Sequence, residues 1–178
     1  MLSRRAWYWL LVGLLFLSGG CTTGKKNKRT EESVRAEVTE SFGRLKEAIA
    51  DLRRGDAEKL WDILAEESHA EAAKKAKQFR AEFAKLDKQE QAEQAKEYGA
   101  TADQIREKLS GYGYIQLMAE KFYKRWWMLT AAEIDHITLD QKKVEALVYY
   151  KQDDAEPQIP SLRFVLEDDQ WNAILPIP

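Results

Sequence analysis

The chain has 178 residues, of which 44% are hydrophobic and 33% charged, and its formal net charge is −2. This length and composition predict a globular protein with enough residues for one domain and a hydrophobic core. A mild acidic balance spread through the chain argues against a nucleic-acid partner. The single cysteine excludes an intramolecular disulfide.

The first 20 residues are predicted to be a secretory signal peptide. Two arginines at positions 4 and 5 precede an uncharged apolar run over residues 6–17, and three small residues, 18–20, follow it. A positive start, a short apolar run and small residues in that order are typical of a secretory signal. The apolar run is shorter than the roughly 17–25 residues that a transmembrane helix needs.

Cys21 follows these small residues directly. The segment Leu17-Ser18-Gly19-Gly20-Cys21 resembles the lipobox of bacterial lipoproteins, although that family prefers Leu where Ser18 stands. In the family the cysteine is diacylated and becomes the new N-terminus, so the resemblance implies lipidation of Cys21, export and a membrane lipid as partner. Several acyl chains anchor a protein firmly. An ordinary signal peptide with an incidental cysteine, or an uncleaved anchor, is the alternative.

Residues 21–30 are predicted to form a lipid-anchored tether. They contain four cations and, after the cysteine, no apolar residue. Basic side chains there can lie on anionic headgroups, and a solvated linker is the alternative. In lipoproteins of bacteria with two membranes, Asp after the cysteine often retains the protein at the inner membrane, so Thr22 favours the outer membrane.

Residues 31–178 are expected to form a single α+β domain. A first helix is predicted over Thr30–Arg54, because its apolar residues recur at spacings of three and four and form one stripe. Gly55 is expected to end this helix and Asp56 to cap a second one. The stripe consists of Val34, Val38, Phe42, Leu45, Ile49 and Leu52.

An extended helical segment is predicted around residues 68–109. Ser68, with Glu71 three residues later, fits a capping box and indicates a helix that continues to Tyr98. Thr101 is expected to begin a short helix after it.

In the following part, Gly111 and Gly113 are expected to break the chain before a helix over Tyr114–Trp127. Apolar and polar residues then alternate, which predicts four antiparallel strands. Helices first and an antiparallel meander last are typical of an α+β protein. The alternation covers residues 137–139, 144–150, 162–166 and 171–175.

Two parts of the chain resemble a known superfamily. They are the helix junction, with Gly55-Asp56 followed by Trp61 and Leu64, and the closing hairpin over residues 162–171. Both are similar to the cone-shaped nuclear transport factor 2-like, or ketosteroid isomerase-like, superfamily. The resemblance implies a curved sheet wrapped around the first helix, with a pocket inside the cone. It implies no reaction, because members include enzymes and non-catalytic binding domains alike.

The histidines are the candidate general bases. His136 lies near the start of the first strand, and a histidine in a pocket can move protons near neutral pH. Neighbouring strand residues point to opposite faces, so Asp135 is not expected to pair with it. His69 is interpreted as an ordinary surface residue. Two separated histidines and one cysteine make no familiar metal-ligand pattern, so no metal and no cofactor are predicted.

An aromatic cluster between residues 112 and 127 is the most suggestive feature of the chain. Such side chains can line a pocket for an apolar or glycan ligand, or contact an envelope protein. The alternative is that they belong to the core. Adjacent tryptophans cannot both face inward on a helix, so one is expected to be exposed. The candidate surface comprises Tyr112, Tyr114, Tyr123, Trp126, Trp127 and His136.

The leading functional hypothesis is a lipid-anchored envelope protein with a non-catalytic domain that binds a ligand or partner. A small pocket enzyme of the isomerase or dehydratase type is the second hypothesis, and a purely structural envelope protein is the third. A polar cavity that contains His136 or a buried acid would favour the enzyme. A filled interior with an exposed aromatic patch would favour binding.

Overall fold

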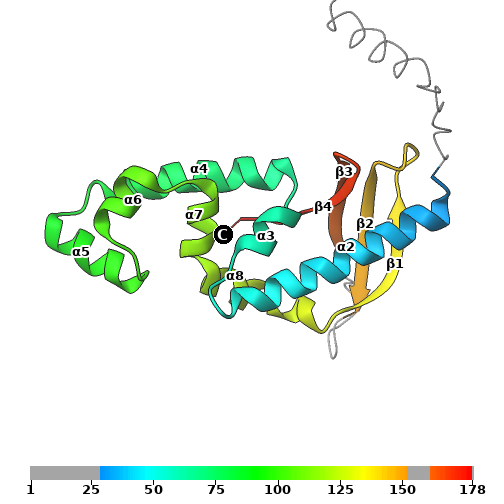
Figure 1. Ribbon diagram of the computed structural model, residues 1–178, viewed down its shortest axis with the longest axis horizontal. Coiled ribbons are helices and arrows are strands. Elements are labelled where there is room, and N and C mark those ends of the chain that lie inside the picture. The colour runs from blue at the N-terminus through cyan, green and yellow to red at the C-terminus, as the bar shows by residue number, and fades with distance from the viewer. Residues whose placement is uncertain (1–28, 152–160, 178) are drawn as a thin grey trace, which may run out of the picture.

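The computed structural model describes residues 29–151 and 161–177 (Figure 1). The predicted signal peptide, Cys21 and most of the predicted tether lie outside the described residues. Within them, seven α-helices precede a four-stranded antiparallel sheet, which confirms the α+β prediction. None of the helices in this part of the chain combines the length and apolarity needed to cross a bilayer.

Helix α2 (Glu31–Leu52) begins and ends close to the predicted bounds. The Thr30 side chain caps it by accepting a hydrogen bond from the backbone N–H of Ser33 at 3.1 Å. Gly55, with φ of +75°, adopts the left-handed conformation just beyond its end. Helix α3 (Glu58–Ile63) follows, and Ala57 holds the position just before it. The predicted cap is present, because the Asp56 carboxylate accepts a hydrogen bond from the backbone N–H of Glu58 at 3.0 Å. The whole predicted apolar stripe of α2 is buried.

The capping box predicted at Ser68 is wrong. Helix α4 (Glu66–Phe83) begins two residues earlier, so Ser68 lies inside it, with 1% of its surface exposed. Its hydroxyl donates to the backbone carbonyl of Leu175 at 3.2 Å and accepts from the Leu175 N–H at 3.0 Å. Ser68 therefore ties the end of the chain to α4.

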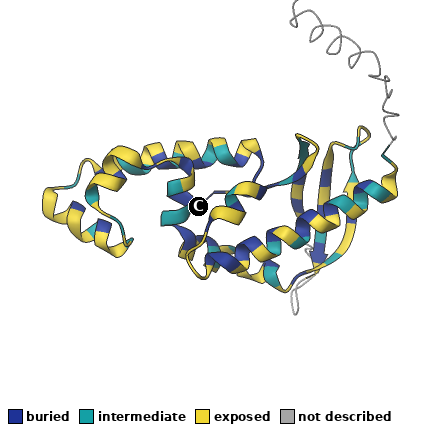
Figure 2. Cartoon of the chain, in the orientation of Figure 1, coloured by how far each residue is buried: buried dark blue, intermediate teal, exposed yellow. Residues whose placement is uncertain are grey.

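The predicted long helix from 68 to 98 is divided in two. A capping box at Asp87 starts a separate helix, α5 (Lys88–Glu97). The predicted start at Thr101 is confirmed, because Thr101 forms a capping box for α6 (Ala102–Lys108). These helices extend away from the sheet, and α5 and α6 are largely exposed (Figures 1 and 2).

The predicted chain break at Gly111 and Gly113 is also wrong. Both glycines lie in the first turn of α7 (Gly111–Leu117), which Ser110 caps. Gly111 is needed for packing, because a Cβ there would lie 3.0 Å from the backbone nitrogen of Ala73 in α4. Helix α8 (Ala119–Trp126) and a 3₁₀ turn, η1 (Trp127–Thr130), complete the helical part.

The sheet has the strand order β1-β2-β3-β4, and every neighbouring pair is antiparallel. Asp140 forms the β1–β2 turn by accepting hydrogen bonds from the N–H groups of Val144 and Glu145 at 2.7 and 2.9 Å. Asp168 and Asp169 both have positive φ, of 48° and 63°, as a tight hairpin turn requires. The strands are β1 (Glu133–Leu139), β2 (Glu145–Lys151), β3 (Ser161–Glu167) and β4 (Gln170–Ile174).

One hydrophobic core joins the helices to the inner face of the sheet. Helix α2 lies along this face, and the buried sides of the helix and strands turn toward each other (Figure 2). The buried inward residues are 0–6% exposed, so the space between α2 and the sheet is filled by side chains. From the sheet they are Ile137, Ala146, Val148, Tyr150, Leu162, Phe164, Trp171 and Ala173.

Candidate functional site

The aromatic residues singled out from the sequence do not form one surface. Tyr114 is 6% exposed and its ring meets Phe79 at a centroid distance of 6.0 Å, so it belongs to the core. Tyr112 points the other way, is 38% exposed and contacts Trp61 edge-on. Trp61 in turn stacks on His69 at 4.0 Å. His69 is thus half-buried in an aromatic contact, whereas the sequence suggested an ordinary surface position.

Helix α8 and turn η1 carry the exposed aromatic surface. Trp127 is 52% exposed, whereas Trp126 is half-buried, so one of the two tryptophans is exposed as expected. Met128, which the sequence reasoning missed, is 43% exposed and adjoins Trp127. We call Tyr123, Trp126, Trp127 and Met128 the aromatic patch. Tyr123 is half-buried within it.

The expectation that Asp135 and His136 point apart is wrong. Along β1, Ile134 pairs with Tyr150 but His136 pairs with Tyr149, so Asp135 is the extra residue of a β-bulge. The bulge removes the alternation and brings the two side chains together, with Nδ1 of His136 2.7 Å from a carboxylate oxygen of Asp135. The signal in the sequence was the spacing of Ile134 and Ile137, which both face the core although they are three residues apart.

Neighbouring side chains hold Asp135 and His136 in this arrangement. A carboxylate only accepts, so Nδ1 of His136 donates to Asp135 and Nε2 is the free nitrogen of the neutral ring. Lys151 contacts the other carboxylate oxygen at 3.1 Å, and the His136 ring stacks on Tyr149 at 4.2 Å. The hydrogen bond from His136, with a further one from Lys151, lowers the pKa of Asp135. This arrangement can accept a proton at Nε2.

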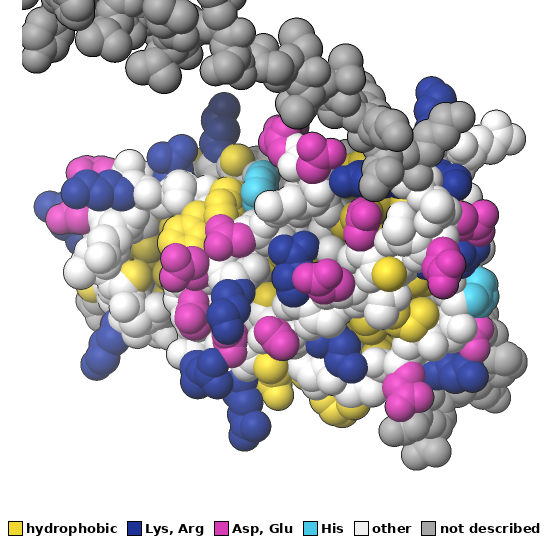
Figure 3. Space-filling model, turned by 45° about the vertical axis from the view of Figure 1, so that its right-hand side comes forward, with side chains coloured by type: hydrophobic (Ala, Val, Ile, Leu, Met, Phe, Trp, Pro, Cys, Tyr) yellow, Lys and Arg dark blue, Asp and Glu magenta, His cyan; other side chains and the backbone are white. Residues whose placement is uncertain are grey.

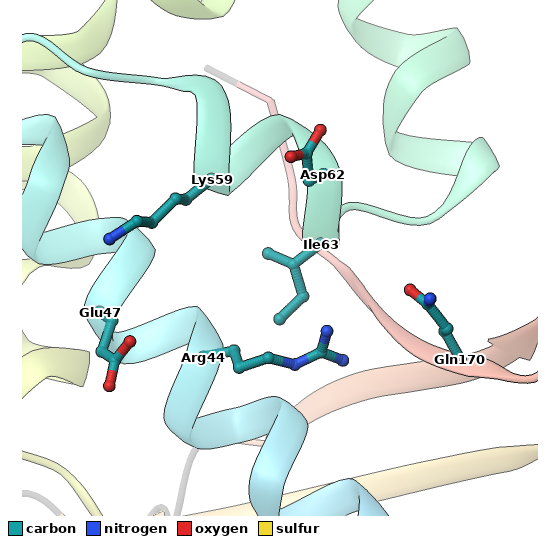
Figure 4. A pocket seen from close by; sticks show the side chains of 6 residues that line it. All are labelled: Arg44, Glu47, Lys59, Asp62, Ile63 and Gln170. Carbon is teal, nitrogen blue, oxygen red and sulfur yellow. The ribbon is translucent and has the colours of Figure 1, made fainter.

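Two hollows lie beside α2, where the sequence indicated no site. Two adjoining hollows of about 370 and 350 Å³ share Arg44 and Gln170. Neither hollow is lined by His136, and the first lies between α2, α3 and the start of β4 (Figure 4). The first hollow, which we call the polar groove, is lined by Arg44, Glu47, Lys59, Asp62, Ile63 and Gln170.

The charges of the polar groove differ in how far they are neutralised. Lys59 contacts Asp51 at 2.8 Å, which raises the pKa of Lys59 and lowers that of Asp51. The Arg44 guanidinium instead donates to the hydroxyl of Ser41 at 2.9 Å, and the described residues offer it no ion pair. In Figure 4 it reaches into the space between Ile63 and Gln170. Arg44 is therefore available to an anionic group.

Acidic side chains complete this surface. Glu47 and Asp62 line the same groove and make no ion pair within the described part of the chain. Figure 3 shows the same mixture on a wider scale, with acidic and basic side chains interspersed and only small apolar areas between them. The groove thus offers both a cation and carboxylates at its surface. Because its residues come from α2, α3 and β4, only folding reveals it.

Comparison with protein-family models, with curated proteins and with solved structures found no match. Among the described residues, no three His, Cys, Asp or Glu side chains lie close enough together to hold a metal ion.

Proposed function

We propose that the protein is an exported bacterial lipoprotein, held on a membrane by lipid on Cys21, whose α+β domain binds a ligand or partner without catalysis. The lipobox-like segment that ends at Cys21 supports the anchor. The first described helix follows the Thr30 cap, and we assign residues 21–30 to the tether. The outer membrane is the favoured location, because Thr22 follows the cysteine.

The filled interior is the observation that supports a binding role most strongly. A pocket enzyme of the kind found in the cone-shaped superfamily would need a hollow between the first helix and the sheet. In this chain Val38, Leu45, Val148 and Phe164 are all 0% exposed in the core that occupies this space. In this proposal a ligand or partner therefore binds on the outside of the domain.

The polar groove is the surface that we assign to the ligand. The Arg44 guanidinium suits a carboxylate or another anionic group, with which it can form paired hydrogen bonds. Glu47 and Asp62 suit a cation on the same ligand. A peptide segment that carries both charges matches this pattern, because complementary charges determine specificity and register.

Site-specific photo-crosslinking in the native envelope tests this assignment. A photoreactive residue in place of Asp62 should give a crosslinked adduct of defined mass, and the exposed Lys77 of α4 provides the matched control position. Arg44→Glu should remove the Asp62 adduct by placing an acid where the ligand anion binds. Equal crosslinking from positions 62 and 77, or an adduct that is insensitive to Arg44→Glu, would show that the groove is not the binding site.

An isomerase- or dehydratase-type enzyme is the second candidate, favoured by the hydrogen bond between Asp135 and His136. The His136 side chain is 49% exposed, so a substrate would have to be handled at the open surface of β1. A panel of isomerase and dehydratase substrates tests this candidate. Turnover that His136→Gln abolishes would establish the enzyme and refute the non-catalytic proposal.

A further inference from the structure

The segment formed by α8 and η1 combines exposed apolar side chains with cations. Trp127 and Met128 are 52% and 43% exposed and adjacent in the chain. Three exposed cations precede them on α8: Lys121, Lys124 and Arg125. The Arg125 guanidinium lies 5.5 Å from the ring centre of Trp126. Apolar and basic side chains are therefore neighbours on this segment and meet at Arg125 and Trp126.

The cations are only partly neutralised. The one acid of α8, Glu120, bonds Lys124 at 2.6 Å. Lys121 contacts the ring and hydroxyl of Tyr98 instead of an acid. Arg125 makes no ion pair with any described residue. An exposed tryptophan beside unpaired cations is the combination that binds at the interface of an anionic membrane, where the ring lies at headgroup depth and the cations contact phosphates.

We infer that the aromatic patch and the cations of α8 lie on the anionic lipid surface of the membrane that holds Cys21. This inference rests on the proposed lipid anchor and names a second contact with the same membrane. One lipid-modified residue on a tether leaves a domain free to rotate. Contact through α8 and η1 would fix its orientation.

The tether is long enough for both contacts. Lys46 of α2 donates to the backbone carbonyl of Ala132, just after η1, at 2.8 Å. The axial rise along α2 from Thr30 to Lys46 is roughly 24 Å. An extended chain over residues 21–29 reaches roughly 27 Å. Cys21 can therefore enter the bilayer on which the aromatic patch rests.

The proposed orientation leaves the polar groove open. Arg44 lines the groove, whereas Lys46 contacts the end of η1. Residues two apart on an α-helix project roughly 200° from each other. The same arrangement recurs earlier in α2. Arg35 contacts the β1 carbonyl of Ile137, whereas Glu37, two residues later, lines the second hollow. The groove thus lies on the flank of α2 away from η1, so a membrane at η1 leaves it accessible to a partner.

Depth-dependent quenching on the lipidated protein tests the inference. Lipid on Cys21 blocks the only native thiol, so Met128→Cys supplies a single site for an environment-sensitive fluorophore. The matched control is Lys77→Cys on the exposed side of α4. Both proteins are reconstituted in vesicles of phosphatidylethanolamine and phosphatidylglycerol with brominated acyl chains. The label at position 128 should lose emission, the label at 77 should not, and Arg125→Glu should reduce the loss at 128.

The other outcomes are distinguishable. Equal emission at positions 128 and 77, on protein whose mass shows the lipid, would overturn the membrane contact and leave the anchor standing. A blue shift at 128 without quenching by brominated lipid would mean that a second copy of the chain covers the patch, which also overturns the inference. A mass without lipid on Cys21 would overturn both the anchor and the contact that depends on it.

Discussion

Gly111 and Gly113 lie in one turn of α7, yet alanine should have opposite effects at the two positions. A Cβ at position 111 would lie 3.0 Å from the backbone nitrogen of Ala73 and 3.2 Å from the Trp61 ring. Backbone cannot move aside as a flexible side chain can. At position 113 the nearest atoms, including Leu109 Cδ1, are 3.4 Å away, which is an ordinary contact.

The magnitudes follow from these distances. Replacing a helical glycine by alanine stabilises a helix by about 0.5–1 kcal/mol. Overpacking of a close contact costs about 1–3 kcal/mol. Gly113→Ala should therefore stabilise the domain by about 0.5–1 kcal/mol. Gly111→Ala should destabilise it by about 1 kcal/mol, because a mid-range strain of about 2 kcal/mol exceeds the gain in helix propensity.

Urea and thermal unfolding of the two variants measure this difference. A change of 1 kcal/mol shifts the midpoint by about 2–4 °C in a chain of this size, so the variants should unfold several degrees apart on opposite sides of the unchanged protein. Each variant serves as the control of the other for helix propensity. If Gly111→Ala gains stability as Gly113→Ala does, α7 does not pack on α4 at the distance described.

Three further substitutions test other parts of the account. Ser68→Ala leaves the buried N–H and carbonyl of Leu175 without their partner, so it should lower the free energy of unfolding by about 1–3 kcal/mol in urea titrations. An unchanged midpoint would show that the Ser68–Leu175 hydrogen bonds do not stabilise the domain. Asp51, whose pKa is lowered first by the hydrogen bond from Lys59, contributes stability above its unfolded pKa of 3.8, which is lost as pH falls through the lower folded value. Asp51→Asn should therefore be less stable at neutral pH, and its unfolding midpoint should fall less steeply as the pH is lowered. A pH profile parallel to that of the unchanged protein would count against the ion pair of Asp51 with Lys59. Asp140→Ala should speed hydrogen exchange of the turn amides it binds, and unchanged protection there would refute its role.

Local patterns predicted the parts of the fold that depend on neighbours in sequence. The stripe of α2 and the alternation of β2 each reflect one buried side, and that burial sets the period. Gly55 and Thr101 were also predicted correctly, because helix ends need particular backbone and side-chain groups. The error at Gly111 has a different source. A glycine that breaks a chain and one that admits a neighbouring helix look the same in a sequence.

The candidate site was predicted less well, because it depends on contacts between distant residues. Arg44 and Gln170 meet only after β4 packs beside α2, and no local spacing records this. The pairing of Asp135 with His136 depends on one extra residue in β1, which reverses the usual alternation. The exposure of one of the two adjacent tryptophans could be inferred, since two adjacent helical residues cannot share one face, but the sequence did not indicate that it is Trp127.

The mass of the mature protein's N-terminal peptide tests the central proposal most directly. The protein would be expressed from its full sequence in a bacterium, extracted from the envelope and digested. The account predicts a peptide that begins at Cys21 and carries a diacylglyceryl group, which is absent from Cys21→Ser. A mature N-terminus at another residue, or an unmodified thiol on Cys21, would contradict it.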